Sequence, residues 1–128
     1  MMGQPLPKKI IAIVDDDESM REGAKALVRS LGYDARTFCT AEEFLASAGI
    51  DKTACLITDL NMPGLSGIEL RQRLVALGNP IPTILITAYA DPRSRALAAK
   101  VGIVCYLPKP FRDDELIECL REAMSLGD

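Results

Sequence analysis

Short apolar runs alternate with segments of helical periodicity along nearly the whole chain, and this alternation restricts the fold more than any other feature. Five runs have lengths typical of strands. They span residues 10–14, 34–38, 54–58, 83–87 and 105–107. Strict alternation predicts a parallel sheet covered on both faces, because each parallel connection must return over the sheet, usually through a helix. We therefore expect an α/β fold with a doubly wound, five-stranded parallel sheet.

Helix signals fill the intervals between the runs and follow the last one. The intervening helices are expected at residues 19–31, 41–48, 68–77 and 94–101, each ending just before a glycine. Ser19 and Glu22 have the spacing of a capping box for the first helix. A fifth helix is expected after the last run, with Asp113 or Asp114 as its N-terminal cap. Acidic side chains favour helix N-termini, so Asp17 and Glu18 are interpreted as helix N-terminal charges.

The length of the chain predicts one domain. With 128 residues, 48% of them hydrophobic and 26% charged, the chain has the composition of a globular protein with one core. We expect residues 1–128 to form a single domain whose core covers about 9–124. The first seven residues are expected to be a loose leader, and the residues after Met124 a fraying end.

Charge and histidine content exclude several functions. Lys and Arg number 15 against 18 Asp and Glu, a net charge of −3. This balance argues against direct nucleic-acid binding, which relies on a basic surface. The chain has no histidine, so it cannot build a Ser-His-Asp or Cys-His nucleophile from its own residues.

The cysteines and the apolar stretches favour a cytoplasmic protein without a membrane span. Cys39, Cys55, Cys105 and Cys119 lack metal-site or redox-motif spacing and are expected to be buried, reduced thiols. The longest uncharged stretch, 74–90, contains glycine and prolines. It falls short of the roughly 20 apolar residues that a membrane-spanning helix needs.

Polar side chains stand where four of the expected strands end. Asp15 and Asp16 follow the first strand and Asp59 the third, while Thr87 ends the fourth and Lys109 follows the fifth. Ligands of such sheets bind at the carboxyl ends of the strands, where these side chains should converge. Converging carboxylates repel one another unless a cation neutralises them. Mg²⁺ is the expected cofactor, because it prefers oxygen ligands.

Four short motifs occur in a specific order along the chain. They are Val14-Asp15-Asp16, Thr58-Asp59-Leu60-Asn61-Met62-Pro63-Gly64 with Gly67, Ile86-Thr87-Ala88 and Lys109-Pro110-Phe111. In this order they resemble the receiver domain of two-component response regulators, and the resemblance extends from about Lys9 to Met124. It implies a flavodoxin-like fold of the chemotaxis-receiver type, with strand order 2-1-3-4-5.

The resemblance also implies a phosphoacceptor and its metal ligands. Asp59 would accept a phosphoryl group from the phosphohistidine of a histidine kinase or phosphotransfer protein. Asp16 and, directly or through water, Asp15 would hold Mg²⁺ together with Asp59 and the Asn61 carbonyl. Such a domain is not an enzyme acting on an outside substrate. It assists its own phosphotransfer and its own dephosphorylation.

The remaining implied roles concern the phosphoryl group and the response to it. Thr87 and Lys109 would contact the phosphoryl group, and Thr87 and Tyr106 would form a switch. The Lys109-Pro110 bond is expected to be cis. Tyr89 is expected to flank Asp59 opposite Asn61 and to hinder the water that hydrolyses the phosphate.

Partners and competing functions complete these expectations. Receivers of this kind suggest a homodimer through the fourth helix, fifth strand and fifth helix, and a DNA-binding effector beyond this chain. One alternative is a degenerate receiver that only binds proteins. Another is a small aspartyl-phosphate hydrolase, because Asp15-x-Asp17-x-Ser19 imitates the first motif of haloacid-dehalogenase-like phosphatases.

Overall fold

A computed structural model describes residues 7–126, within which strands and α-helices alternate as expected. The strands are β1 (Ile10–Val14), β2 (Asp34–Phe38), β3 (Thr53–Asp59), β4 (Thr83–Thr87) and β5 (Cys105–Pro108). The helices are α1 (Glu18–Ser30), α2 (Ala41–Leu45), α3 (Gly67–Ala76), α4 (Pro92–Lys100) and α5 (Asp113–Leu126), with a short 3₁₀ turn, η1 (Ile50–Lys52), before β3.

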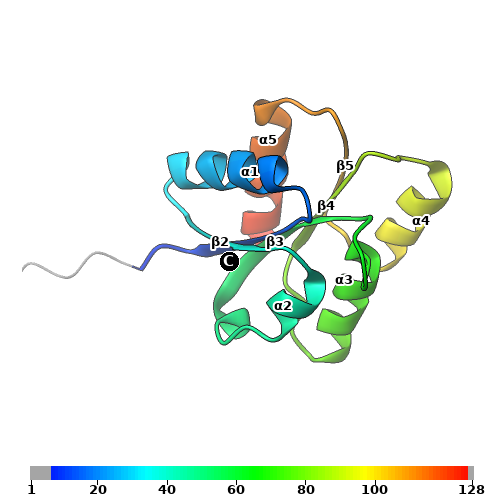
Figure 1. Cartoon of the computed structure of the whole chain (residues 1–128), viewed down its shortest axis with the longest axis horizontal. Helices are drawn as coiled ribbons and strands as arrows, with labels where there is room; N and C mark the ends of the chain where they lie inside the picture. The colour runs from blue at the N-terminus through cyan, green and yellow to red at the C-terminus, as the bar shows by residue number, and fades with distance from the viewer. Residues whose placement is uncertain (1–6, 127–128) are drawn as a thin grey trace, which may run out of the picture.

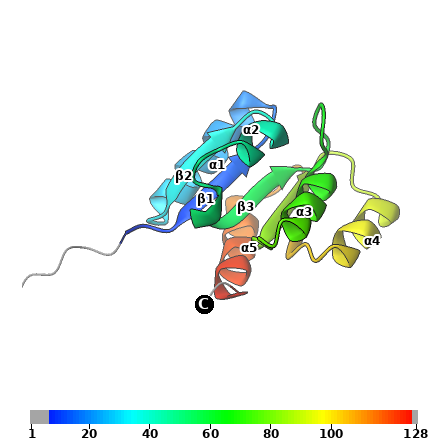
Figure 2. The same ribbon diagram turned by 90° about the horizontal axis from the view of Figure 1, so that it is seen from below.

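The five strands form one parallel sheet in the order β2-β1-β3-β4-β5. Figure 2 shows β2, β1 and β3 side by side. The chain winds from β1 to one edge and then, from β3 onward, to the other. The first connection therefore runs in the direction opposite to the later ones, and the predicted doubly wound sheet is confirmed. The carboxyl ends of β1 and β3 lie next to each other at the point of reversal.

Helices cover both faces of the sheet, with α1 and α5 on one face and α2 and α3 on the other (Figure 1). Side chains of β1 alternate between the two. Ile11 and Ile13 belong to the core cluster that includes residues of α1 and α5, whereas Ala12 and Val14 belong to the cluster beneath α2 and α3. Burial on both faces explains why the central strands are apolar throughout instead of alternating with polar residues.

The first helix begins earlier than its sequence predicts. Its N-cap is Asp17, whose side chain accepts a hydrogen bond from the Met20 N–H at 3.1 Å. The predicted capping box of Ser19 and Glu22 is wrong because both residues lie inside the helix. Asp17 satisfies a free helical N–H two residues earlier than the predicted cap would. The interpretation of Asp17 and Glu18 as helix N-terminal charges is confirmed.

Other helix ends also shift by a few residues. Helix α5 begins at Asp113, so neither Asp113 nor Asp114 precedes it as a cap; instead Glu115 accepts the Arg112 N–H at 2.9 Å. Helix α2 ends at Leu45, where the Ser47 hydroxyl donates to the Phe44 carbonyl at 2.6 Å. A hydroxyl that satisfies a terminal carbonyl favours such an early end.

Of the two expectations for the chain ends, the described residues test the one for the C-terminal end. Helix α5 continues to Leu126, so fraying directly after Met124 is not observed. Most of the expected leader at residues 1–7, namely residues 1–6, lies outside the described residues, as do residues 127–128. Across residues 7–126, no helix combines the length and hydropathy that crossing a membrane requires.

The four cysteines are free, as predicted, but only two are buried. Cys55 and Cys119 lie in the core, Cys105 is partly buried and Cys39 is exposed. Cys39 directly follows β2, an edge strand. The prediction of burial is therefore wrong for Cys39, because an edge strand has a neighbour on one side only.

Gly67 lets α3 begin directly against the end of β3. A Cβ at this position would lie 2.5 Å from the Asp59 carbonyl oxygen and 2.6 Å from a methyl carbon of Leu85. The nearer contact is to backbone and cannot rotate away. Gly67 thus sets the distance between α3 and the strand that carries Asp59.

We predict that Gly67→Ala lowers the free energy of unfolding by about 1–3 kcal/mol, the usual cost of overpacking a core. Gly23→Ala is the matched control, because this helical glycine is exposed and has no atom within 4 Å of an added Cβ. There alanine should stabilise by about 0.5–1 kcal/mol. Urea unfolding measures both changes. Equal effects of the two substitutions would contradict the packing argument.

Candidate functional site

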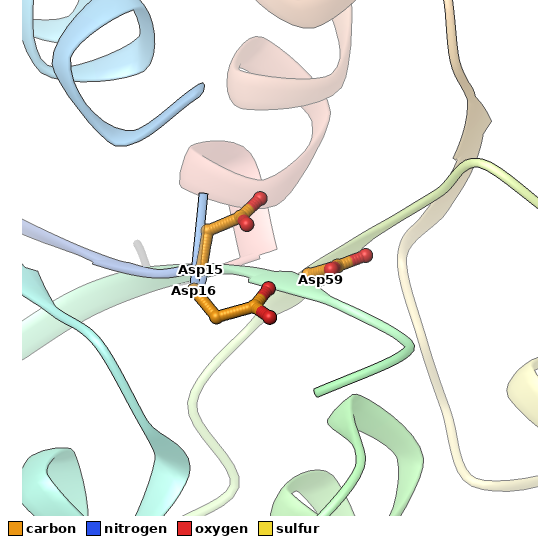
Figure 3. Close-up of side chains that lie close together, drawn as sticks. All are labelled: Asp15, Asp16 and Asp59. Atoms are coloured by element: carbon orange, nitrogen blue, oxygen red, sulfur yellow. The ribbon is translucent and has the colours of Figure 1, made fainter. Parts of the chain in front are cut away.

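Three carboxylates meet at the carboxyl edge of the sheet, as their positions at strand ends predict. Asp15 and Asp16 come from the end of β1 and Asp59 from the end of β3 (Figure 3). Each offers one oxygen, and these oxygens lie within 4.8 Å of one another. Asp15 and Asp59 are buried, whereas Asp16 is exposed. The cluster therefore has one solvent-facing side.

Asp15 is the most enclosed of the three, with 3% of its surface exposed. One carboxylate oxygen accepts the Asp17 N–H at 2.9 Å, and the other lies 3.6 Å from the Lys109 ammonium. Burial nevertheless raises the pKa of Asp15 above its ordinary value. The hydrogen bond and the ion pair oppose that rise but do not cancel it.

The pKa of Asp59 is raised as well. Burial, reinforced by the negative charge of Asp15, raises the pKa of Asp59 to about 6, while Lys109 and the Asn61 N–H act in the opposite direction. Without a metal, the positive charge near Asp59 is too small to offset the cost of ionising its carboxyl group. A cation beside the cluster would add the positive charge that stabilises the ionised form.

The donor set fits a hard divalent cation. It consists of carboxylate oxygens, one of them facing solvent, which is the combination that Mg²⁺ binds while keeping some of its own waters. Asp15, Asp16 and Asp59 form this set, and no other group of three metal-ligating side chains is found within residues 7–126. Of the predicted ligands, these three converge; Asn61 follows two residues after Asp59.

Thr87 ends β4 and is completely buried. Its hydroxyl oxygen accepts hydrogen bonds from the Asn61 side-chain amide at 3.3 Å and from the Tyr89 N–H at 3.0 Å. Both contacts use the oxygen as an acceptor and leave the hydroxyl proton available for donation. The loop after β3 is therefore linked to the end of β4 through Asn61.

Lys109 is directed to the acidic cluster, although its close partner is Asp15 and not Asp59. Its N–H donates to the Thr87 carbonyl at 2.7 Å, which fixes it beside β4. The predicted cis Lys109-Pro110 bond is confirmed. Pro108 pairs with Thr87 on the outer strand β5, a position that tolerates a residue without an N–H.

Tyr106 points to α4. Its hydroxyl contacts the Ser94 hydroxyl and accepts the Asp91 N–H at 3.3 Å. The guanidinium carbon of Arg95 lies 4.5 Å from the centre of its ring, a cation–π geometry. The predicted switch residue is thus bound to the first turn of α4. Tyr89 is 74% exposed, and its shielding of Asp59 stays a prediction.

Two contacts near the site were not anticipated from the sequence. The Arg21 guanidinium donates to the Asp15 carbonyl at 2.9 Å, and the Glu42 carboxylate accepts the Leu65 N–H at 3.2 Å. The contact of Arg21 is weakly indicated by the sequence, because Arg21 lies only six residues after Asp15, at the start of the helix that follows the site. Glu42 gives none, because it is separated from Leu65 by 23 positions and resembles an ordinary helix N-terminal acid.

Comparison with known proteins agrees with this geometry. Residues 11–121 match the model of the response regulator receiver domain. The chain is 37% identical over 120 residues to response regulator protein TmoT of Ectopseudomonas mendocina, covering 94% of this chain and 54% of TmoT. It is 42% identical over 113 residues to nodulation protein W of Bradyrhizobium diazoefficiens, covering 88% of this chain and 50% of that protein.

A solved structure gives the same result in three dimensions. The response regulator receiver protein from Burkholderia phymatum superposes with a TM-score of 0.79 at 36% identity, covering 92% of this chain and 96% of that one. Against the two curated relatives, by contrast, the chain spans about half of their length, 54% and 50%.

The raised pKa of Asp59 predicts how stability depends on pH without metal. Because the pKa of Asp59 in the folded protein, about 6, exceeds its ordinary value of 3.8, the folded state binds the extra proton between these values. Stability therefore falls as pH rises through that interval. Asp59→Asn removes this penalty. At pH 7 it should stabilise the metal-free protein by about 1–3 kcal/mol, less at pH 4.

Urea unfolding in EDTA at several pH values measures the difference between the two proteins. Asp51→Asn, which changes an exposed aspartate in η1, serves as the control and should leave the pH profile unchanged. An Asp59→Asn variant that is less stable than the parent at pH 7 would contradict the assigned cause.

Proposed function

Since the chain belongs to the response regulator receiver family and forms a receiver domain of two-component signalling, we propose that Asp59 is its phosphoacceptor. The donor is the phosphohistidine of a histidine kinase or phosphotransfer protein. The observation that carries this proposal is the buried Asp59 carboxylate, grouped with Asp15 and Asp16 and lying in the field of Lys109. The proposed unit is a single domain, residues 1–128, with its core at about 9–124.

Transfer begins with an in-line attack. One carboxylate oxygen of Asp59 attacks phosphorus, an oxygen–phosphorus bond forms, and the bond from phosphorus to the histidine nitrogen breaks with its electron pair leaving on that nitrogen. Asp59 must be ionised for this step. Its backbone carbonyl lies directly against Gly67, at the start of α3.

The side chains around Asp59 provide charge and hydrogen bonds for the phosphoryl oxygens. Lys109 supplies a positive charge, and Thr87 supplies the hydroxyl proton that its two accepted hydrogen bonds leave available. Asp15, Asp16, Asp59 and the Asn61 carbonyl are the proposed Mg²⁺ ligands. When bound, Mg²⁺ neutralises negative charge that otherwise opposes the transfer. Hydrolysis of the phosphate by the same site, slowed by Tyr89, completes the proposed cycle.

The response to phosphorylation is proposed to pass through Thr87 and Tyr106 to α4. Drawing the Thr87 hydroxyl to a phosphoryl oxygen disturbs the contacts it makes with Asn61 and Tyr89. Tyr106 on the adjacent strand holds the first turn of α4. Helix α4 buries only Ala98, so little packing resists its movement.

The face made by α4, β5 and α5 is proposed to pair two copies of the chain. Helix α4 carries basic residues and the first turn of α5 is acidic, so the two copies can attract each other there.

The output and the location of the regulator are proposed on other grounds. The curated relatives are about twice as long as this chain, which supports a DNA-binding effector as the output of the full regulator. The free cysteines support a cytoplasmic location.

Phosphoryl transfer to Asp59 is tested with acetyl phosphate and mass spectrometry. The parent chain should gain one phosphoryl group in Mg²⁺ and none in EDTA, whereas Asp59→Asn should gain none in either. Asp51→Asn should behave as the parent. Labelling that survives Asp59→Asn, or that ignores chelation, would overturn the assignment. An unlabelled parent would favour a degenerate receiver, and turnover of a generic phosphate ester a hydrolase.

The switch is tested by adding beryllofluoride, which imitates the phosphoryl group, and recording amide chemical shifts. We expect changes from Thr87 to Lys109, including α4, as well as around Asp15 and Asp59. Tyr106→Phe, which lacks the hydroxyl that holds α4, should alter the changes in α4 and leave those around Asp59. Changes restricted to Asp15, Asp59 and their neighbours would disprove the proposed route.

A further inference from the structure

Glu42 connects α2 to the loop between β3 and α3. It occupies the first turn of α2, and its side chain crosses to this loop, where the carboxylate accepts the Leu65 N–H at 3.2 Å. The loop begins directly after Asp59 and ends at Ser66, the N-cap of α3. Glu42 thus contacts the segment that follows the phosphoacceptor, although it belongs to a helix outside the acidic cluster.

Gly64 provides a second observation at the same place. It has a φ of +79°, a conformation that favours glycine, and a Cβ there would overlap the Glu42 carboxylate. The absence of a side chain at Gly64 therefore serves two purposes. It permits the turn, and it admits the Glu42 carboxylate close to the backbone, where that group can reach Leu65.

Both ends of the loop are held by hydrogen bonds to the rest of the fold. At its start the Leu60 N–H donates to the Ile86 carbonyl at 2.8 Å. At its end Ser66 and Glu69 form a capping box, with reciprocal hydrogen bonds of 3.0 and 3.1 Å. Between these ends the Asn61 side chain donates to the Thr87 hydroxyl at 3.3 Å. Glu42 adds a further attachment at Leu65, just before the capping box. It therefore limits how far the intervening turn can shift relative to Asp59.

We propose that Glu42 is a positioning residue for the metal site, acting through the loop that carries the Asn61 carbonyl. This inference rests on the proposed function. The carboxylate oxygen of Glu42 acts as a hydrogen-bond acceptor for Leu65 and thereby fixes the backbone between Asp59 and α3. Its contribution comes from that hydrogen bond and not from its negative charge, which distinguishes it from Asp15 and Asp16.

The first test examines the loop in the metal-free protein. Amide hydrogen exchange at Leu65 should become roughly three- to tenfold faster in Glu42→Ala, as the loss of one hydrogen bond of ordinary net strength implies. Glu42→Gln keeps an acceptor oxygen and should exchange nearly as the parent does. Glu43→Ala, which removes the same charge from the same turn, should leave the exchange of Leu65 unchanged.

The second test measures the Mg²⁺ concentration that gives half-maximal labelling of Asp59 by acetyl phosphate. Glu42→Ala should need roughly three- to tenfold more Mg²⁺, again by the strength of one hydrogen bond, and should reach the parental labelling rate at saturation. Glu42→Gln and Glu43→Ala should resemble the parent.

The outcomes separate this inference from the proposed function. If Glu42→Gln is impaired as strongly as Glu42→Ala, the effect comes from charge and the inference is overturned. If Glu42→Ala matches Glu43→Ala in both measurements, Glu42 has no positioning role. A parent chain that shows no Mg²⁺-dependent labelling overturns the proposed function itself, and the inference with it.

Discussion

Burial of two neighbouring carboxylates is the physical constraint that governs this structure. Asp15 and Asp59 lie side by side with little exposure, and burial raises the pKa of both. The fold offsets part of that cost with Lys109 and with backbone N–H groups. The remainder makes the site favourable for a cation, as the proposed phosphoryl transfer to Asp59 requires.

The elements around the cluster differ in how firmly they are fixed, and the difference matches their proposed roles. The chain next to Asp59 is held tightly, by Gly67 behind it and by Glu42 at the end of the turn. Helix α4 has few buried residues and is attached at its ends, through Tyr106 near its start and through Arg71, which donates to the Val101 carbonyl at 3.1 Å, near its end. A rigidly held Asp59 beside a weakly packed α4 suits a domain in which a local change of charge moves a helix.

Helix and strand identities were predictable because they depend on local patterns, but their exact ends depend on competition between neighbours. Ser19 and Glu22 satisfied the spacing of a capping box, yet Asp17 formed the cap because it lies closer to the end of β1 and reaches the Met20 N–H. In the same way, Cys39 resembled the other cysteines in sequence but is exposed, since β2 is an edge strand. The sequence carries the candidates for such contacts, and packing selects among them.

Residue types at short spacing were enough to predict the order of elements, the acids at the strand ends and the family. Which atoms meet became evident in the folded chain: Lys109 lies nearest Asp15, Tyr106 binds the first turn of α4, and Glu42 reaches Leu65. The physical reason is that these contacts join residues far apart in the chain. Their geometry is set by how the sheet and helices pack together, and no local pattern records it.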